Sequence, residues 1–324
     1  MASRLRSALS AGEFALLHQP VVDLTTGKVA AVAALLNTLW QRRTRWSATA
    51  TRMKRRLDRV RLTVLFLGSW GAIATASTTT ILRSAGTTTR VVALSGAVAL
   101  AVATFLTAQY LTAESTRRWT RARAVSEGIK QRILTFRAIG DAQQTERLLT
   151  EIEGIEQAAE DLLPLLAPGD DAVQAPRSMR PDEYVRDRVR AQIDDYYLPT
   201  ARCYGARATR LRRAAVGLGL AATIVAAINT GVGAESSGRI APWVAVMTTL
   251  SGSLLAYLAG KRYDFLVMTY LATADRLRRR LDRWRADGSP TDRVRWAEFV
   301  TDCENTISLE NASWMAKWGE RAES

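Results

Sequence analysis

Residues 62–82, LTVLFLGSWGAIATASTTTIL, contain no charged side chain. As a helix rising about 1.5 Å per residue, such a stretch crosses a hydrocarbon layer of about 30 Å. Three more uncharged stretches follow at 91–113, 214–234 and 240–260. The rest of the chain is dense in charge, so the mean hydropathy of −0.06 conceals a sharp division. We predict an all-α membrane protein with four transmembrane helices.

Positive charge is placed asymmetrically around these four stretches. The chain has 45 Lys and Arg against 31 Asp and Glu. Cations crowd the segments before the first and third stretches and after the second and fourth, whereas the two connecting loops carry only Arg83 and Arg90, and Glu235 and Arg239. Because cationic loops are retained in the cytoplasm, we expect both termini to be cytoplasmic.

The two halves of the chain repeat one pattern. Each has a basic helix, an uncharged stretch, a short loop, a second uncharged stretch with Tyr-Leu near its end, and a long basic helix. Tyr110-Leu111 corresponds to Tyr257-Leu258. Each repeat contains two spans, so both copies enter the bilayer in the same sense. We therefore predict two tandem, parallel two-transmembrane hairpins, which argues against an inverted-repeat transporter.

The segments outside the spans set the expected domain boundaries. Residues 141–163 are acidic and place apolar residues at alternating spacings of four and three, which predicts a short coiled-coil-like cytoplasmic helix. Residues 167–181, rich in Pro, Gly and Asp, predict a linker. Residues 182–198 predict a helix that ends at Pro199, and 292–318 a C-terminal amphipathic helix. The expected domains are a first two-span unit at 37–166 and a second at 182–324, preceded by a segment at 1–36.

Local signatures of catalysis are missing. The chain has no phosphate-binding glycine loop, no paired-cysteine metal motif and no Gly-x-Ser-x-Gly. His18 is the only histidine, and Cys203 and Cys303 are a hundred residues apart. Asp302, Glu304 and Glu310 form an acidic cluster that we expect to pair with neighbouring cations. We predict no enzymatic activity, no cofactor and no metal site.

Polar and small residues inside the spans are the candidate functional residues. The candidate pore-lining or helix-contact residues are Thr75, Thr79, Gln109, Asn229, Thr249 and Ser253. Hydroxyls in membrane helices also bond their own backbone or join helices, and that alternative stays open. The candidate helix-packing residues, spaced four apart, are Gly68, Ala72, Ala76, Gly252, Ala256 and Gly260.

The second half resembles the SLATT domain, the two-transmembrane effector domain found beside nucleotide-generating SMODS enzymes and nucleotide-sensing SLOG domains in bacteria. The resemblance rests on PDEYVRDR at 181–188, on the hairpin and on KRY at 261–263, and it extends through FVTDCE at 299–304 and ENASW at 310–314. Its cytoplasmic motif residues here are Tyr263, Glu304, Glu310 and Trp314. The first half, about 37–140, resembles a sister version of the domain. The resemblance implies a bacterial inner-membrane effector and transfers no catalytic residue.

A second resemblance covers only the N-terminus. GEFALLHQPVVDL at 12–24 is similar to the opening of EAL cyclic-di-GMP phosphodiesterases, but Ala33-Ala34-Leu35 stands where that family has Glu-Ala-Leu. The metal-binding carboxylate and most of the barrel are missing. We expect residues 1–36 to be a poorly ordered remnant.

The leading functional hypothesis is an effector that oligomerises and permeabilises the inner membrane in a nucleotide-signalled anti-phage system. Four helices of this size do not surround a wide channel alone, so this hypothesis requires a homo-oligomer. The alternative is a non-conducting membrane scaffold or sensor subunit for a cytoplasmic partner. A cyclic-dinucleotide enzyme is a third hypothesis, which the missing metal glutamate disfavours. Expected partners are membrane lipid, further copies of the chain and a cytoplasmic nucleotide-sensing or nucleotide-generating protein, but not nucleic acid, because topology already explains the arginine-rich helices.

Overall fold

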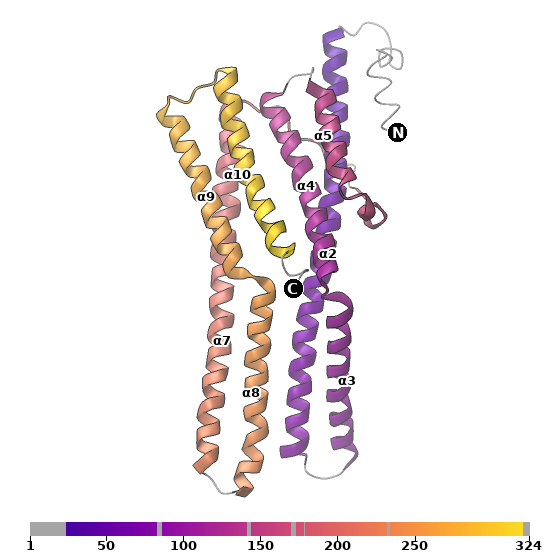
Figure 1. Ribbon diagram of the computed structural model, residues 1–324, viewed down its shortest axis with the longest axis vertical. Helices are drawn as coiled ribbons and strands as arrows, with labels where there is room; N and C mark the ends of the chain where they lie inside the picture. The colour runs from indigo at the N-terminus through magenta and orange to yellow at the C-terminus, as the bar shows by residue number, and fades with distance from the viewer. Residues whose placement is uncertain are drawn as a thin grey trace. The chain divides into compact units, whose positions relative to one another are not determined.

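The computed structural model describes residues 24–82, 86–140, 144–169, 173–177, 179–231 and 234–319, and within these ranges the side chains of 24–29, 234–239 and 310–319 are not described. The described residues form helices and no strand (Figure 1). The helices are α2 Leu24–Thr80, α3 Thr87–Tyr110, α4 Ala113–Ile139, α5 Thr145–Gln157, the 3₁₀ helix η3 Glu160–Leu165, α6 Pro181–Glu183, the π-helical segments η4 Tyr184–Arg190 and η5 Gln192–Tyr197, α7 Leu198–Gly231, α8 Ala234–Lys261, α9 Tyr263–Ala286 and α10 Arg293–Gly319.

The chain divides into two compact units that do not follow its two halves. One unit, here the core unit, has its described residues within 24–51, 120–186 and 280–315. The other, here the span unit, contains 52–119 and 187–279, and therefore all four uncharged stretches. The expected division into consecutive two-span domains thus differs from the observed one, because each sequence half contributes to both units.

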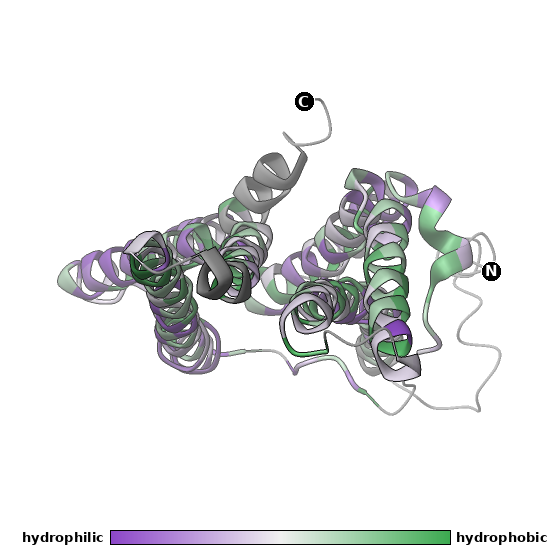
Figure 2. Cartoon of the chain, turned by 90° about the horizontal axis from the view of Figure 1, so that it is seen from below, coloured by the Kyte–Doolittle hydropathy of each residue, from purple (hydrophilic) through white to green (hydrophobic). Residues whose placement is uncertain are grey.

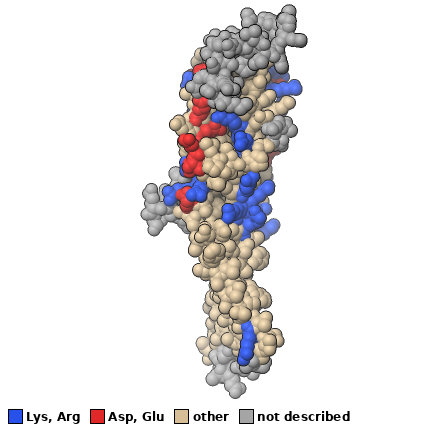
Figure 3. All heavy atoms as spheres, turned by 90° about the vertical axis from the view of Figure 1, so that its right-hand side faces the viewer, with Lys and Arg blue, Asp and Glu red and all other residues tan. Residues whose placement is uncertain are grey.

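Four helices are long and apolar enough to cross a membrane: they lie within 30–80, 87–110, 181–231 and 240–286. Large apolar side chains on them point outwards, among them Phe66, Leu94 and Val216, each more than 60% exposed. The hydrophobic residues of these helices are green in Figure 2. On the face drawn in Figure 3, a long surface with few charged side chains is followed by a zone where Lys and Arg gather. This distribution is the reverse of that in a water-soluble helix bundle, where apolar residues turn inwards.

Close backbone approach joins α2 to α3. A Cβ added at Gly96 would lie 2.8 Å from the Cβ of Ala74, and one at Gly71 would lie 2.5 Å from Cγ of Leu100. The predicted packing residue Gly68 has nothing within 4 Å of such a Cβ. The close approach in this pair is therefore made at Gly71 and Gly96, and Ala76 of the predicted small-residue face is also buried.

A stripe of alanines spaced seven apart is buried along α7. It consists of Ala201, Ala208, Ala215 and Ala222. Within the span unit α7 and α8 lie side by side (Figure 1), and Ser251 Oγ of α8 donates a hydrogen bond to the carbonyl of Ala215 at 2.8 Å. Small side chains allow two helix backbones to approach this closely. Gly252, predicted to pack, has open space beside it.

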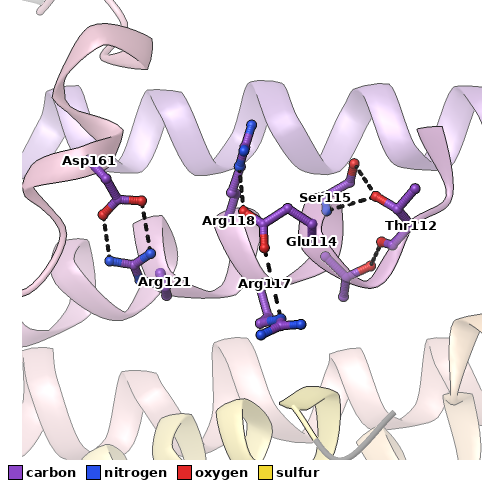
Figure 4. A network of polar contacts seen from close by, with 8 residues as sticks. Thr112, Glu114, Ser115, Arg117, Arg118, Arg121 and Asp161 are labelled. Atoms are coloured by element: carbon purple, nitrogen blue, oxygen red, sulfur yellow. Dashed lines mark hydrogen bonds and ion pairs between the residues drawn. The ribbon is translucent and has the colours of Figure 1, made fainter. Parts of the chain in front are cut away.

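Both second spans end at a defined break. After Tyr110, Leu111 and Thr112 separate α3 from α4, and the Thr112 hydroxyl accepts the backbone N–H of Ser115 at 3.1 Å, as an N-cap does (Figure 4). After Lys261, the break is Arg262, whose φ of 49° is uncommon for a residue with a side chain. The membrane-type helices α3 and α8 are thus distinct from the polar helices that follow.

The helix predicted to stop at Pro199 continues to Gly231. The segment before it is π-helical, and the Leu198 N–H bonds to the carbonyl of Ile193, five residues back. Proline normally breaks a helix by its missing N–H and a clash with the carbonyl four residues back. The wider π turn places the preceding carbonyls differently, and we attribute the continuity of the helix to this change.

Two other segments also differ from expectation. Residues 24–36, expected to be poorly ordered, form the start of α2, with Leu35 and Leu36 buried, whereas 1–23 lie outside the described residues. The linker is irregular, but it is tied to α2: the Ala167 N–H donates to Oγ1 of Thr49 at 2.7 Å and the Ala175 N–H to Oδ1 of Asn37 at 2.9 Å. Pro and Gly predicted the lack of regular structure, and the side chains of α2 supply the missing hydrogen-bond partners.

The α2–α3 contact predicts that leucine substitutions at two glycines of this helix pair change the stability of the protein by different amounts. Gly96→Leu should destabilise the protein by about 1–3 kcal/mol, because the new side chain overpacks against Ala74. Gly68→Leu, the matched control, enters open space and should not. Thermal unfolding in detergent measures both, and equal melting temperatures for the two variants would refute this contact.

Candidate functional site

The two described members of the acidic cluster predicted on the C-terminal helix, Asp302 and Glu304, have separate contacts. Asp302 pairs with Arg280, which also donates to Oγ1 of Thr306 at 2.9 Å. Glu304 turns inwards and is 1% exposed. Glu310 lies in the part of α10 whose side chains are outside the described residues, as does Trp314. No group of three metal-ligating side chains occurs in the described part of the chain.

Glu304 instead anchors the core unit. Its Oε1 accepts a hydrogen bond from the Tyr184 hydroxyl at 3.0 Å, and Tyr184 is fully buried. Tyr184 also meets Trp296 edge-on at 5.6 Å between ring centroids, and Trp284 stacks on Phe299 at 4.9 Å. The motif at 181–188 and the motif at 299–304 are therefore the two sides of one buried contact. Their residues hold the fold together and present no open site.

This contact indicates a structural role for the C-terminal helix. Trp296, Phe299, Val300, Cys303 and Ile307 of α10 are all buried. The helix therefore forms part of the core, and its buried side chains act as packing anchors. Deleting the chain after Gly288 would remove that core together with any binding surface.

The acidic segment also packs inside the core unit. α5 ends at Gln157, and its apolar residues Leu148 and Ile152 are buried. Trp46 donates its indole N–H to Oε1 of Glu156 at 3.0 Å, and Arg42 pairs with the same carboxylate. The predicted 23-residue helix is interrupted at 158–159 before η3.

Arg121 fixes the turn that follows α5. It holds Asp161 with two parallel hydrogen bonds of 2.9 and 2.6 Å (Figure 4) and donates a third, of 2.8 Å, to the carbonyl of Ala158. The pattern of four and three thus marks a face buried within the chain, and the described contacts of this face need no second helix of a coiled coil.

Two arginines of the core unit, Arg42 and Arg137, have a pKa lowered by burial. Burial lowers the pKa of the Arg137 guanidinium in the last turn of α4. An arginine pKa lies so far above neutral that the group remains charged in the cell. These shifts create no acid–base site.

Several threonine hydroxyls in the spans donate hydrogen bonds to backbone carbonyls of their own helices. Thr75 Oγ1 donates to the carbonyl of Gly71 at 2.9 Å, and Thr79 Oγ1 to that of Ala76 at 3.0 Å. Thr248 does the same toward Val244 at 3.0 Å. For Thr249, which is exposed, and Ser253, which is half-buried, the structure gives no hydrogen bond to another helix. Thr75, Thr79 and Thr248 therefore follow the simpler of the two alternatives, in which their own helix satisfies the hydroxyl, whereas Ser251 bonds to a neighbouring helix.

The two amide side chains lie at helix ends. Gln109 is exposed in the last turn of α3, which ends at Tyr110, and Asn229 lies two residues before the end of α7. The Oδ1 of Asn229 is buried and has no hydrogen-bond donor in the described structure. These positions are at the limits of the apolar stretches, where an amide is less costly than at a bilayer centre.

Tyrosines that precede the third uncharged stretch and follow the fourth form a cluster in the span unit. Tyr197 and Tyr270 lie 5.6 Å apart between ring centroids, Tyr204 and Tyr263 lie 5.4 Å apart, and Tyr204 stacks on Tyr270 at 6.2 Å. The motif residue Tyr263 is thus a packing residue between α7 and α9. Sequence reasoning singled out Tyr263 but missed this cluster, because its members are far apart in the chain.

Each Tyr-Leu tyrosine sits beside a cation. The guanidinium of Arg56 lies 4.7 Å from the Tyr110 ring centroid, and the Lys261 ammonium lies 5.6 Å from that of Tyr257. Lys261 also forms a 2.6 Å ion pair with Asp58 of α2. The sequence repeat predicted the equivalence of the two tyrosines, whereas the ion pair that joins the two halves was not predicted.

Paired apolar helices with cations at one end are typical of helical membrane proteins. The four long apolar helices place this protein in that class. Within it, residues 184–314 match the family described as SMODS and SLOG-associating 2TM effector domain 1. Residues 44–141 match a different family, a protein of unknown function, DUF4231. No curated protein and no solved structure matches the chain.

The second half is therefore similar to this two-transmembrane effector domain family. The first half is matched as DUF4231 and not as a second SLATT copy, and neither match includes the N-terminal segment that resembles an EAL domain. Neither matched family is described as an enzyme.

The Tyr184–Glu304 contact gives a direct test of the core unit. Tyr184→Phe removes the donor to a buried carboxylate and should destabilise the fold by about 1–3 kcal/mol. Arg147→Gln removes an ion pair to Glu151 in which the Arg147 side chain is 81% exposed, and it should leave stability nearly unchanged. Chemical unfolding monitored by tryptophan fluorescence compares the two, and equal stability of both variants would contradict a structural role for this hydrogen bond.

Proposed function

We propose that this protein is an inner-membrane effector that oligomerises and permeabilises the membrane when a nucleotide signal is sensed during conflict with phage. The observation that carries the proposal is the SLATT match over 184–314 on two apolar helices, accompanied by a second apolar pair in the first half. In this proposal 62–80, 91–110, 214–231 and 240–260 cross the membrane as two same-sense hairpins, and both termini are cytoplasmic.

The first half is, in this proposal, a divergent copy of the same unit. Both halves place a cation beside the tyrosine of Tyr-Leu, and both interrupt the helix shortly afterwards, at Leu111–Thr112 and at Arg262. These shared local features support duplication more specifically than hydropathy does.

Permeabilisation requires several copies in this proposal. The hydroxyls of Thr75, Thr79 and Thr248 are bonded to carbonyls of their own helices, so these positions are compatible with either lipid or another helix beside them. The open positions beside Gly217 and Gly252 leave room for close helix approach from another copy. Lining of a pore by Thr75, Thr79, Thr249 and Ser253 would then arise only in the assembly.

Dye release from liposomes tests the proposal. Purified protein reconstituted into vesicles loaded with fluorescent solutes of graded size should release the smaller ones when oligomeric or when a candidate nucleotide and its sensor are supplied. Gly96→Leu, which disrupts the α2–α3 contact, should reduce release, whereas Gly68→Leu provides the matched control. Retention of all solutes in every oligomeric and nucleotide condition would rule out permeabilisation.

A scaffold or sensor subunit for a cytoplasmic partner is the second candidate. A groove of about 670 Å³ runs along one face of α10, with Val294, Ala297 and Thr301 among its lining residues. Val294 is 67% exposed, although it lies on a helix that otherwise forms the core. Vesicles that stay sealed while the protein still captures a nucleotide-sensing or nucleotide-generating protein would favour this candidate.

Orientation can be tested with a native cysteine. Cys203 is exposed on α7, before the third uncharged stretch, whereas Cys303 is buried. In spheroplasts that exclude dye, a membrane-impermeant maleimide should label Cys203 only after detergent is added. The Cys203→Ser variant identifies the labelled residue, and labelling of intact spheroplasts would reverse the proposed topology.

A further inference from the structure

A single carboxylate stands in the most basic part of the span unit. Asp58 is the only acidic residue between positions 24 and 113, a segment that carries twelve Lys and Arg. Its location on α2 is four residues before the first uncharged stretch. A lone acid among so many cations reduces local repulsion, but which cation it contacts depends on the fold.

The structure pairs Asp58 with the other half of the chain. Asp58 Oδ1 lies 2.6 Å from the Lys261 ammonium at the end of α8 and 3.6 Å from Nη1 of Arg61. On the α8 side, a Cβ at Gly260 would lie 3.9 Å from Nε of Arg61. The pair therefore lies where α2 of the first half meets α8 of the second.

Burial makes this ion pair different from most others in the protein. The Lys261 side chain is 14% exposed and that of Asp58 is 33% exposed, so the pair is less screened by water and salt than an exposed one. Lys261 is also the only lysine between positions 131 and 316, where every other permanent cation is arginine. Removing one partner of a partly buried pair leaves the other charge uncompensated.

We propose that Asp58 and Lys261 form an electrostatic clamp that holds the two halves of the span unit together, and that release of the clamp lets α2 and α8 separate. Its consequence for permeability rests on the proposed function. Asp58 is the more important partner: without it, Lys261 and Arg61 face each other as like charges, whereas without Lys261 the carboxylate keeps Arg61.

Two measurements on the full chain test the clamp. In thermal unfolding, Asp58→Asn and Lys261→Met should each lower the melting temperature, and the double variant should lose less than the two single losses together. In the liposome assay, each single variant should raise the basal rate of dye release by about fivefold or more, as expected for a coupling of typical size, with Asp58→Asn exceeding Lys261→Met. The exchange Asp58→Lys with Lys261→Asp should restore much of both properties.

The control is an ion pair that lies within one half. Arg212 and Asp264 are 2.7 Å apart between α7 and α9, with exposed side chains, and Asp264→Asn should change neither measurement. The clamp would be overturned if the two single losses in melting temperature were strictly additive in the double variant. It would also be overturned if the wild type released dye and both single variants released it at the same rate. If the melting temperatures are non-additive but no variant releases dye, the clamp stands and the permeabilising function falls.

Discussion

The separation of charge from apolar helix is the constraint on which this molecule depends. Arginine and lysine are excluded from four stretches of the chain and crowded at one end of them. Because backbone groups in a hydrocarbon layer need internal hydrogen bonds, stretches like these are stable there only as helices. Threonines within them, such as Thr75 and Thr248, satisfy their hydroxyls in the same way, by bonding to a carbonyl one turn earlier. A helix with so many hydroxyls can therefore still present an apolar exterior.

Two kinds of contact join these helices to one another. Small residues bring backbones together, as at Gly96 against Ala74 and along the alanine stripe of α7. Charged contacts act at the basic end, where Asp58 reaches Lys261. Dispersion contacts between small residues are present in any solvent, whereas the ion pair responds to local charge.

The family motifs turn out to be structural. Tyr184 and Glu304, which lie 120 residues apart, meet in the interior of the core unit and are surrounded by Trp296 and Phe299. This arrangement accounts for the C-terminal tryptophans Trp284 and Trp296, which serve as packing anchors well beyond the last apolar stretch.

The sequence by itself determined the helical class, the four apolar stretches and the end at which charge gathers, because composition and periodicity along a single helix are local properties. It also determined the SLATT resemblance of the second half. Tertiary structure alone decided which face of each helix is used, so that Gly71 and Gly96 rather than Gly68 make the close approach. It decided that the helix passes through Pro199 by way of a π turn, and that the apolar face of α5, with Leu148 and Ile152, is buried within its own chain. The partner of Asp58 belongs to the same category, since a residue two hundred positions away becomes a neighbour only after folding.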